Sequence, residues 1–191
     1  LELYANIAST GQPSFLLESA GGRSMGRYSY FSTSPYYRVS GVGSHLAEQP
    51  TWSHSTSGLA PFQRLAQLFA DQHIARPLDA PPFFGGAVGY LSYDLVRQFE
   101  TLPSLASAHP IVPDLEFAFF DLVAAVDHTC NHLVLMYCPP LTRFLGESRE
   151  QLFREGRDRL AAFEALLTQP DAGTAHPDDL GPLTFTPEQE R

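Results

Sequence analysis

The sequence has 191 residues, of which 43% are hydrophobic and 17% are charged, and its formal net charge is −9. This composition is typical of a soluble globular domain, and the length suffices for one sizeable hydrophobic core or a pair of small ones. All 12 basic residues are arginines, and they form no basic stripe. Such an acidic chain is not expected to bind nucleic acid or an anionic membrane surface. Because the sequence has no apolar run of membrane-spanning length and no signal-peptide pattern at its start, we expect a cytoplasmic protein.

The first part of the chain is predicted to form antiparallel strands between residues 15 and 41. An apolar segment at 15–19 ends before two glycines, an aromatic segment at 27–32 alternates with polar residues, and a segment at 36–39 follows a Ser-Pro turn. This alternation, with turn signals between the segments, indicates a meander. The polar stretch at 44–58 is rich in Ser and Thr, and we expect it to be an exposed loop.

An amphipathic helix is predicted at 61–73. Pro61 suits the first turn of a helix, and Arg76-Pro77 provides the stop signal. Apolar residues at i, i+3, i+4 and i+7 place one face of this helix in the core, namely Phe62, Leu65, Ala66 and Phe69.

The segment PPFFGGAVGYLSYDLVRQFE at 81–100 combines three glycines with aromatic residues. Glycines at this density indicate either a tight turn between two buried elements, or backbone that has positive φ or is closely approached by another group. We favour the turn. Asp94, near the end of the segment, is expected to form an ion pair with an arginine such as Arg97.

A β-hairpin is predicted from the apolar segments at 115–126 and 133–137. Both segments are apolar on both faces, so they should supply central strands. Residues 127–132 form the turn and include His128, Cys130 and His132, which are metal-ligand types but fewer than the four ligands of a structural zinc site. Cys130 and Cys138 are expected to be free, partly buried thiols.

A second helix is predicted at 149–168, because Ser148 and Gln151 have the spacing of a capping box. The apolar stripe of this helix consists of Leu152, Phe153, Leu160, Phe163 and Leu167. Its arginines should lie largely on the solvent side, namely Arg154, Arg157 and Arg159.

The pattern as a whole predicts an α+β fold, mostly antiparallel β-sheet with flanking helices. Residues 1–170 should form one domain. Residues 171–191 are rich in Pro, Asp and Gly and contain a new helix start at Thr186, so we expect a linker and the beginning of a second domain there. The absence of an initiator methionine at Leu1 likewise predicts a longer natural chain.

The end of the first predicted strand carries the most suggestive polar residues. Glu18 and Ser19 place a carboxylate and a hydroxyl beside Gly21-Gly22, where they can hold an ammonium group, and Arg27 and Tyr28 on the next strand can face them. Apolar walls with a few converging polar groups suit a zwitterionic amino acid. The alternative is a plain hairpin in which Glu18 pairs with a nearby arginine, Arg23 or Arg27.

Taken together, these segments resemble the N-terminal domain of component I of the chorismate-utilising synthases, which include anthranilate synthase and aminodeoxychorismate (para-aminobenzoate) synthase. The resemblance rests on L-L-E-S at 16–19, G-R-Y-S-Y-F at 26–31, P-F-F-G-G-A-V-G-Y at 82–90 and Y-D-L-V-R at 93–97. The family pattern has Phe where this chain has Tyr30. Motifs in this order cover roughly residues 13–140.

The resemblance implies a two-domain protein in which this domain is not catalytic. Chorismate and Mg²⁺ would bind in the second domain, so no cofactor and no metal is expected here, and a glutamine amidotransferase subunit is the implied partner. A tryptophan pocket is implied at the L-L-E-S segment. Its residues would be Leu17, then Glu18 and Ser19 at the amino group, with Arg27 and Tyr28 in the facing wall. The glycine segment is implied to be a structural motif, consisting of Gly85, Gly86, Gly89, Tyr90, Tyr93 and Asp94.

Two members of the family compete. The short loop at 44–60 and the segment at 93–103 favour aminodeoxychorismate synthase, which makes the para-aminobenzoate precursor for folate, and this is the preferred prediction. The intact L-L-E-S segment favours anthranilate synthase with feedback inhibition by tryptophan. Two non-enzymatic functions also stay open, an amino-acid-binding regulatory module and a structural domain that docks the amidotransferase.

Overall fold

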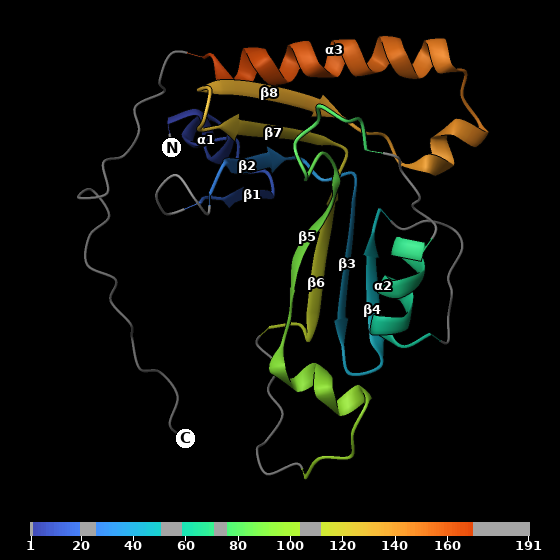
Figure 1. Ribbon diagram of the computed structural model, residues 1–191. Helices are drawn as coiled ribbons and strands as arrows, with labels where there is room; N and C mark the ends of the chain where they lie inside the picture. Colours follow the sequence, from blue (N-terminus) through green and yellow to red (C-terminus); the bar gives the residue numbers. More distant parts are fainter. Residues whose placement is uncertain (1, 20–25, 51–58, 71–75, 104–111, 170–191) are drawn as a thin grey trace.

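The computed structural model describes residues 2–19, 26–50, 59–70, 76–103 and 112–169 (Figure 1). These residues form two four-stranded antiparallel sheets, with strand orders β1-β2-β7-β8 in sheet A and β4-β3-β6-β5 in sheet B. In Figure 1 the strands of sheet B run at a steep angle to those of sheet A, which lies beneath the long helix α3. The α+β prediction is confirmed. None of the helices in the described ranges has the length and apolar character needed to span a bilayer.

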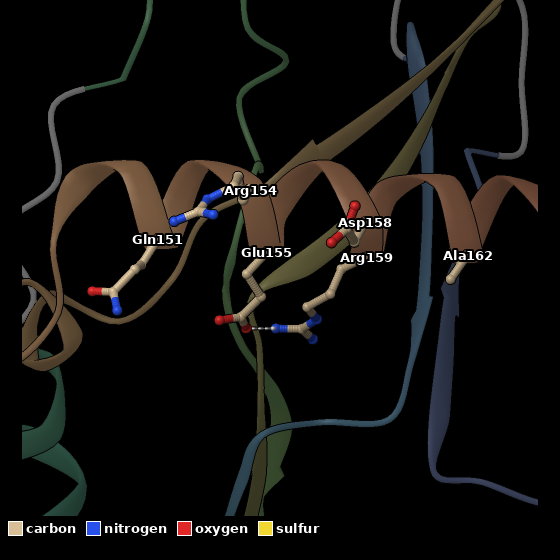
Figure 2. A pocket seen from close by; sticks show the side chains of 6 residues that line it. All are labelled: Gln151, Arg154, Glu155, Asp158, Arg159 and Ala162. Carbon is tan, nitrogen blue, oxygen red and sulfur yellow. Dashed lines mark ion pairs between the residues drawn. The ribbon is translucent and has the colours of Figure 1, made fainter.

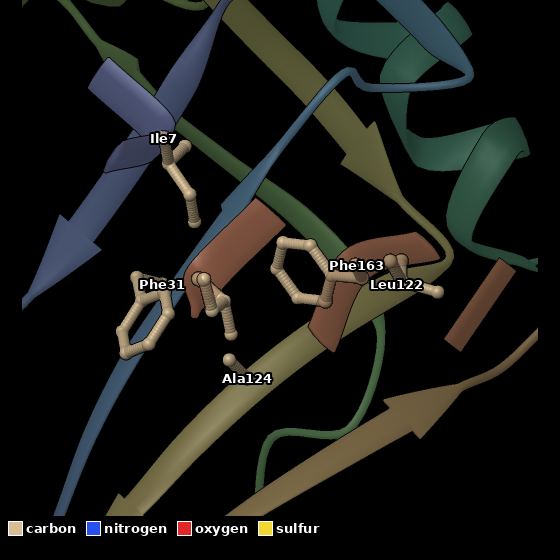
Figure 3. Close-up of a cluster of buried hydrophobic side chains, with 6 residues drawn as sticks. Ile7, Phe31, Leu122, Ala124 and Phe163 are labelled. Atoms are coloured by element: carbon tan, nitrogen blue, oxygen red, sulfur yellow. The ribbon is translucent and has the colours of Figure 1, made fainter. Parts of the chain in front are cut away.

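Sheet A is built from the two ends of the described chain. Its strands are β1 (Ser14–Leu17), β2 (Tyr28–Thr33), β7 (Leu122–Asp127) and β8 (His132–Tyr137). The helices α1 (Glu2–Ala8) and α3 (Arg149–Leu167) pack on one face. The core between them contains Ile7, Phe31, Leu122, Ala124, Phe163 and Leu167 (Figure 3).

Sheet B is formed by the chain between β2 and β7. Its strands are β3 (Tyr37–Val42), β4 (His45–Gln49), β5 (Gly86–Leu91) and β6 (Leu115–Phe120). Helix α2 (Pro61–Ala70) covers one face and buries Leu65 against Tyr37, Val39 and Phe119. The rest of the predicted helix face is less buried: Phe62 is half-buried, and Ala66 and Phe69 are exposed. Two short 3₁₀ helices, η1 (Tyr93–Gln98) and η2 (Leu141–Leu145), complete the described elements.

The predicted strands between residues 15 and 58 need correction. The meander is wrong, because β2 pairs with β7 whereas β3 pairs with β4 and β6 in the other sheet. The change of sheet follows Ser34, whose positive φ of 56° turns the chain. The polar stretch at 44–58 contains β4, and its residues 51–58 lie outside the described ranges. Residues 71–73 of the predicted helix also lie outside them.

The apolar segment at 115–126 is two strands rather than one. β6 belongs to sheet B and β7 to sheet A, and the chain changes sheet at Asp121. The predicted hairpin exists between β7 and β8, but β8 is an edge strand rather than a central one. Both faces of β8 are apolar because Leu135 and Tyr137 pack in the core under α1 and α3, whereas Met136 packs on the other face with Phe15 and Val123.

The glycine segment forms an edge strand, so the predicted tight turn is wrong. Gly89 crosses β6 so closely that an added Cβ would lie 2.0 Å from the carbonyl oxygen of Glu116. Gly86 has φ 133°, which side chains rarely allow, and a Cβ on Gly85 would lie 2.9 Å from the Cβ of Cys138. Glycine is therefore required here because neighbouring atoms approach closely and because φ is positive. These are the two conditions that were named above as alternatives to a tight turn. The Asp94–Arg97 ion pair is confirmed, with Nε 3.0 Å from Oδ1.

Helix α3 begins as predicted. The Ser148 hydroxyl accepts the backbone N–H of Gln151, and the Gln151 side chain accepts the N–H of Ser148, so the capping box is complete. Two side chains differ from the prediction. Phe153 is 68% exposed instead of in the core, and Arg159 turns inward to the buried carboxylate of Asp121.

A candidate ligand site where strands β1 and β2 meet

Ser19 holds the segment after β1 against the start of β2. Its hydroxyl donates to the carbonyl oxygen of Tyr28 at 3.1 Å, and its backbone N–H donates to the Ser29 Oγ at 3.4 Å. Because the hydroxyl proton is used on the carbonyl, the lone pairs of the Ser19 oxygen remain as acceptors. An ammonium group, which only donates, needs acceptors of this kind.

Arg27 lies just before β2 and is held by Asp127 at the end of β7. Its Nε and Nη2 donate to Asp127 Oδ2 at 2.9 and 2.6 Å, and its guanidinium carbon lies 4.9 Å from the centre of the Tyr28 ring. These hydrogen bonds hold the pKa of Asp127 well below its usual range and raise the pKa of Arg27. The Asp127 Oδ1 accepts the backbone N–H of Thr129, so both oxygens of this buried carboxylate are satisfied.

Glu18 is exposed and has no polar partner in the described part of the chain. The alternative in which Glu18 pairs with Arg27 is therefore wrong, and the guanidinium of Arg27 forms its ion pair with Asp127 instead. The other named partner, Arg23, lies outside the described ranges. Glu18 thus presents a carboxylate to solvent beside Ser19.

An apolar surface adjoins these polar groups. Leu17 stands opposite Tyr30 in the β1–β2 ladder and is 46% exposed. Since alternate residues of a strand share a face, Leu17 lies on the same face as Phe15 and points away from the helices that pack on Leu16. The Tyr30 ring is bordered by Tyr28 at 5.9 Å and by Phe83 at 5.7 Å between centroids.

The turn between β7 and β8 contributes residues that sequence reasoning did not place here. His128 Nε2 lies 2.8 Å from Ser29 Oγ, and the His128 backbone N–H donates to the Arg27 carbonyl at 2.9 Å. Asp127 is 100 residues from Arg27 in sequence, so only the pairing of β2 with β7 brings them together. The one available signal was an acidic residue at the end of an apolar strand, a position that usually requires a cation.

The metal-ligand types of this turn serve other purposes or are free. Within the described ranges no three His, Cys, Asp or Glu side chains come together as a ligand set. Cys130 and Cys138 are free thiols, as predicted. Cys130 is exposed, which corrects the prediction that it is partly buried. Cys138 is half-buried, and burial raises the pKa of its thiol.

The glycine motif does not join the candidate site. Gly85, Gly86, Gly89 and Tyr90 belong to the β5 region of sheet B, and Tyr93 and Asp94 to η1, where Tyr93 is 90% exposed. Of this whole segment, Phe83 is the residue whose ring contacts Tyr30. The motif therefore shapes sheet B.

A surface hollow elsewhere lies along α3 (Figure 2). It is lined by Gln151, Arg154, Glu155, Asp158, Arg159 and Ala162. All six side chains come from one helix, so the hollow has no second wall. Its most buried cation, Arg159, is already engaged by Asp121.

Comparisons with known proteins identify relatives of the chain and of its fold. No protein-family model matches the chain. Anthranilate synthase component 1 of Thermus thermophilus is 36% identical over 140 residues, which cover 70% of this chain and 28% of that protein. The proteins of the same name from Streptomyces coelicolor and Mycobacterium bovis are 32% and 29% identical, over 70% and 89% of this chain.

A solved structure of anthranilate synthase component I from Streptococcus pneumoniae has the same fold, with a TM-score of 0.55 and 19% identity over 78% of this chain and 31% of that one. The two sheets and their helices are thus an architecture known from the component I enzymes. The chain belongs to the family of anthranilate synthase component I and corresponds to its N-terminal domain. It spans between 23% and 34% of the length of the three curated relatives.

Proposed function

We propose that the chain is the tryptophan-binding, non-catalytic domain of an anthranilate synthase component I. The observation that carries this choice is the shared name of the three relatives, each an anthranilate synthase component 1. The preferred sequence prediction, aminodeoxychorismate synthase, rested on the loop at 44–60 and the segment at 93–103. It has no counterpart among these relatives, and we replace it with its alternative.

The geometry supports a pocket for a zwitterionic amino acid. The free acceptors of Ser19 and the carboxylate of Glu18 suit the ligand ammonium group. Arg27 uses two of the five N–H donors of a guanidinium on Asp127 and is 59% exposed, so the others are available to a carboxylate. Leu17 and the Tyr28–Tyr30 pair offer an apolar wall to an aromatic side chain.

The activity of the whole protein is part of the proposal. We place the binding of chorismate and Mg²⁺ in a second domain outside this sequence, and the supply of ammonia in a glutamine amidotransferase subunit. The match covers only 28% and 34% of two of these relatives, which leaves room in those proteins for a second domain.

The test uses the natural full-length protein with chorismate, Mg²⁺ and ammonium. We expect anthranilate fluorescence to appear directly and to be suppressed by tryptophan. Ser19→Ala should raise the inhibitory concentration of tryptophan about tenfold without changing kcat, because it removes one hydrogen bond to a charged group. Ser44→Ala, on the exposed β3–β4 turn, is the matched control.

Two results would overturn the proposal. Para-aminobenzoate that forms only after a lyase is added, with no direct fluorescence, would make the protein an aminodeoxychorismate synthase. Activity that tryptophan does not affect, together with no tryptophan binding, would remove the pocket.

A further inference from the structure

We propose that His128 is a positioning residue for the candidate site. Through the Ser29 hydroxyl it fixes the backbone of Ser19, and thereby the direction in which the Ser19 oxygen meets a ligand. The ligand in this inference rests on the proposed function, whereas the chain of hydrogen bonds does not.

His128 is attached to β2 at two points. Its Nε2 lies 2.8 Å from Ser29 Oγ, and its backbone N–H donates to the carbonyl of Arg27 at 2.9 Å. Ser29 Oγ in turn accepts the backbone N–H of Ser19 at 3.4 Å. His128 therefore reaches residues on both sides of the site, Arg27 through its backbone N–H and Ser19 through its side chain and the Ser29 hydroxyl.

The Ser29 hydroxyl can form both hydrogen bonds of this relay at once. A serine hydroxyl has one proton and two lone pairs. If Nε2 accepts the Ser29 proton, the lone pairs of Ser29 are left for the Ser19 N–H. The imidazole proton then lies on Nδ1. Ser29 is only 5% exposed, so without His128 its hydroxyl has little water to turn to and rotates to another acceptor.

The neighbours of His128 show that its position is specific. Cys130 lies on the same turn, His132 is the first residue of β8, and both are exposed. The Cys130 side chain interacts with Asp127, whereas His128 reaches across to Ser29 on β2. His132 therefore provides a matched control, an exposed histidine four residues away for which no side-chain contact with β2 is described.

The experiment compares four variants of the natural full-length protein: His128→Ala, His128→Gln, Ser29→Ala and His132→Ala. Hydrogen exchange of the peptide that ends at Ser19 reports the relay without any ligand, and calorimetry with tryptophan reports the site. We expect His128→Ala and Ser29→Ala to speed exchange and to weaken tryptophan binding about fivefold each, the effect of one ordinary hydrogen bond.

His128→Gln should restore both readouts, because its side-chain amide reaches the place of Nε2, and His132→Ala should change neither. The double variant Ser29→Ala/His128→Ala should be no worse than either single one, since both remove the same link. Unchanged exchange in His128→Ala, or equal losses in the Ala and Gln variants, would overturn the positioning role. Absence of tryptophan binding by the unaltered protein would instead overturn the proposed function, and the exchange data would still decide the relay.

Discussion

The guanidinium of Arg159 forms two hydrogen bonds with the carboxylate of Asp121, the residue at which the chain leaves sheet B and enters sheet A. Asp121 is only 2% exposed. The same guanidinium lies over the Tyr137 ring of β8, with 4.9 Å between its central carbon and the ring centre. Through these contacts, Arg159 links α3 to the junction of the two sheets.

Replacing Arg159 with alanine should destabilise the protein by about 3 kcal/mol, because it leaves a buried carboxylate without its counter-charge. The measurement is the free energy of unfolding from urea titration. Arg157→Ala, an exposed arginine on the same helix, is the control and should cost less than ~0.5 kcal/mol. Equal effects of the two substitutions would show that Asp121 does not depend on Arg159.

Gly89→Ala should destabilise sheet B by about 3 kcal/mol or more, because the new Cβ would overlap the Glu116 carbonyl oxygen and the β6 backbone cannot retreat without losing its ladder. Thermal unfolding measures the change. At Gly146 nothing lies within 4 Å of an added Cβ, so Gly146→Ala is the matched control. A Gly89→Ala variant as stable as wild type would mean that β5 runs farther from β6 than described.

The Arg27–Asp127 pair should make stability depend on acid. Hydrogen bonds from Arg27 lower the pKa of Asp127 on folding below its ordinary value of 3.8, so the pair stabilises the fold fully above that value and the contribution is lost as pH falls below it. The free energy of unfolding of Asp127→Asn should therefore be lower than that of wild type at pH 7, and the difference between the two should decrease below pH ~4. Asp94→Asn removes an exposed pair and should have little effect at any pH. A difference in free energy of unfolding that stays constant down to pH ~2 would contradict this account.

Alkali should weaken the fold through Tyr36 and Tyr37. Burial raises the pKa of each phenol to about 12. Because the folded pKa exceeds the ordinary value of 10, the stabilisation is complete below pH 10 and is lost as pH rises towards 12. Urea titrations at rising pH should show this loss in wild type and a shallower loss in Tyr37→Phe. Tyr93→Phe, at a side chain that is 90% exposed, should behave as wild type; a shallower loss there would show that the effect is not one of burial.

Local patterns predicted the elements that depend on local physics. The capping box of α3, the β7–β8 hairpin and the Asp94–Arg97 pair all involve residues close in sequence, where spacing alone decides which groups meet. The fold class followed from the same signals.

The distribution of strands between two sheets could not be read in this way. Asp121 interrupts an apolar run, but nothing nearby in sequence shows that Arg159, 38 residues later, compensates its charge. Arg159 was accordingly predicted on the solvent side, because the helical period marks a face but not the partner that the face meets. The prediction for Phe153 was wrong for the same reason. The apolar stripe of the helix includes Phe153, but its side chain is exposed rather than packed against the sheet.

In the candidate site, too, contacts between residues close in sequence could be predicted and contacts between distant residues could not. The approach of Ser19 to Tyr28 is a hairpin property and follows from sequence spacing. The partner of Arg27 lies at the end of β7, and His128, which contacts Ser29, lies on the β7–β8 turn; both are about a hundred residues away. Such contacts depend on which strands become neighbours, and no local signal carries that information.

The nesting of sheet B within sheet A sets an order of assembly. All of sheet B lies between residues 37 and 120, whereas sheet A needs strands from both sides of that stretch. When β3 pairs with β6, Tyr37 lies opposite Phe119, so the end of β2 arrives beside the start of β7 and a long loop is replaced by a short one. Because closing a long loop costs entropy before any contact is gained, sheet B is expected to form first and to act as the template on which the two hairpins of sheet A, and with them the candidate site, come together.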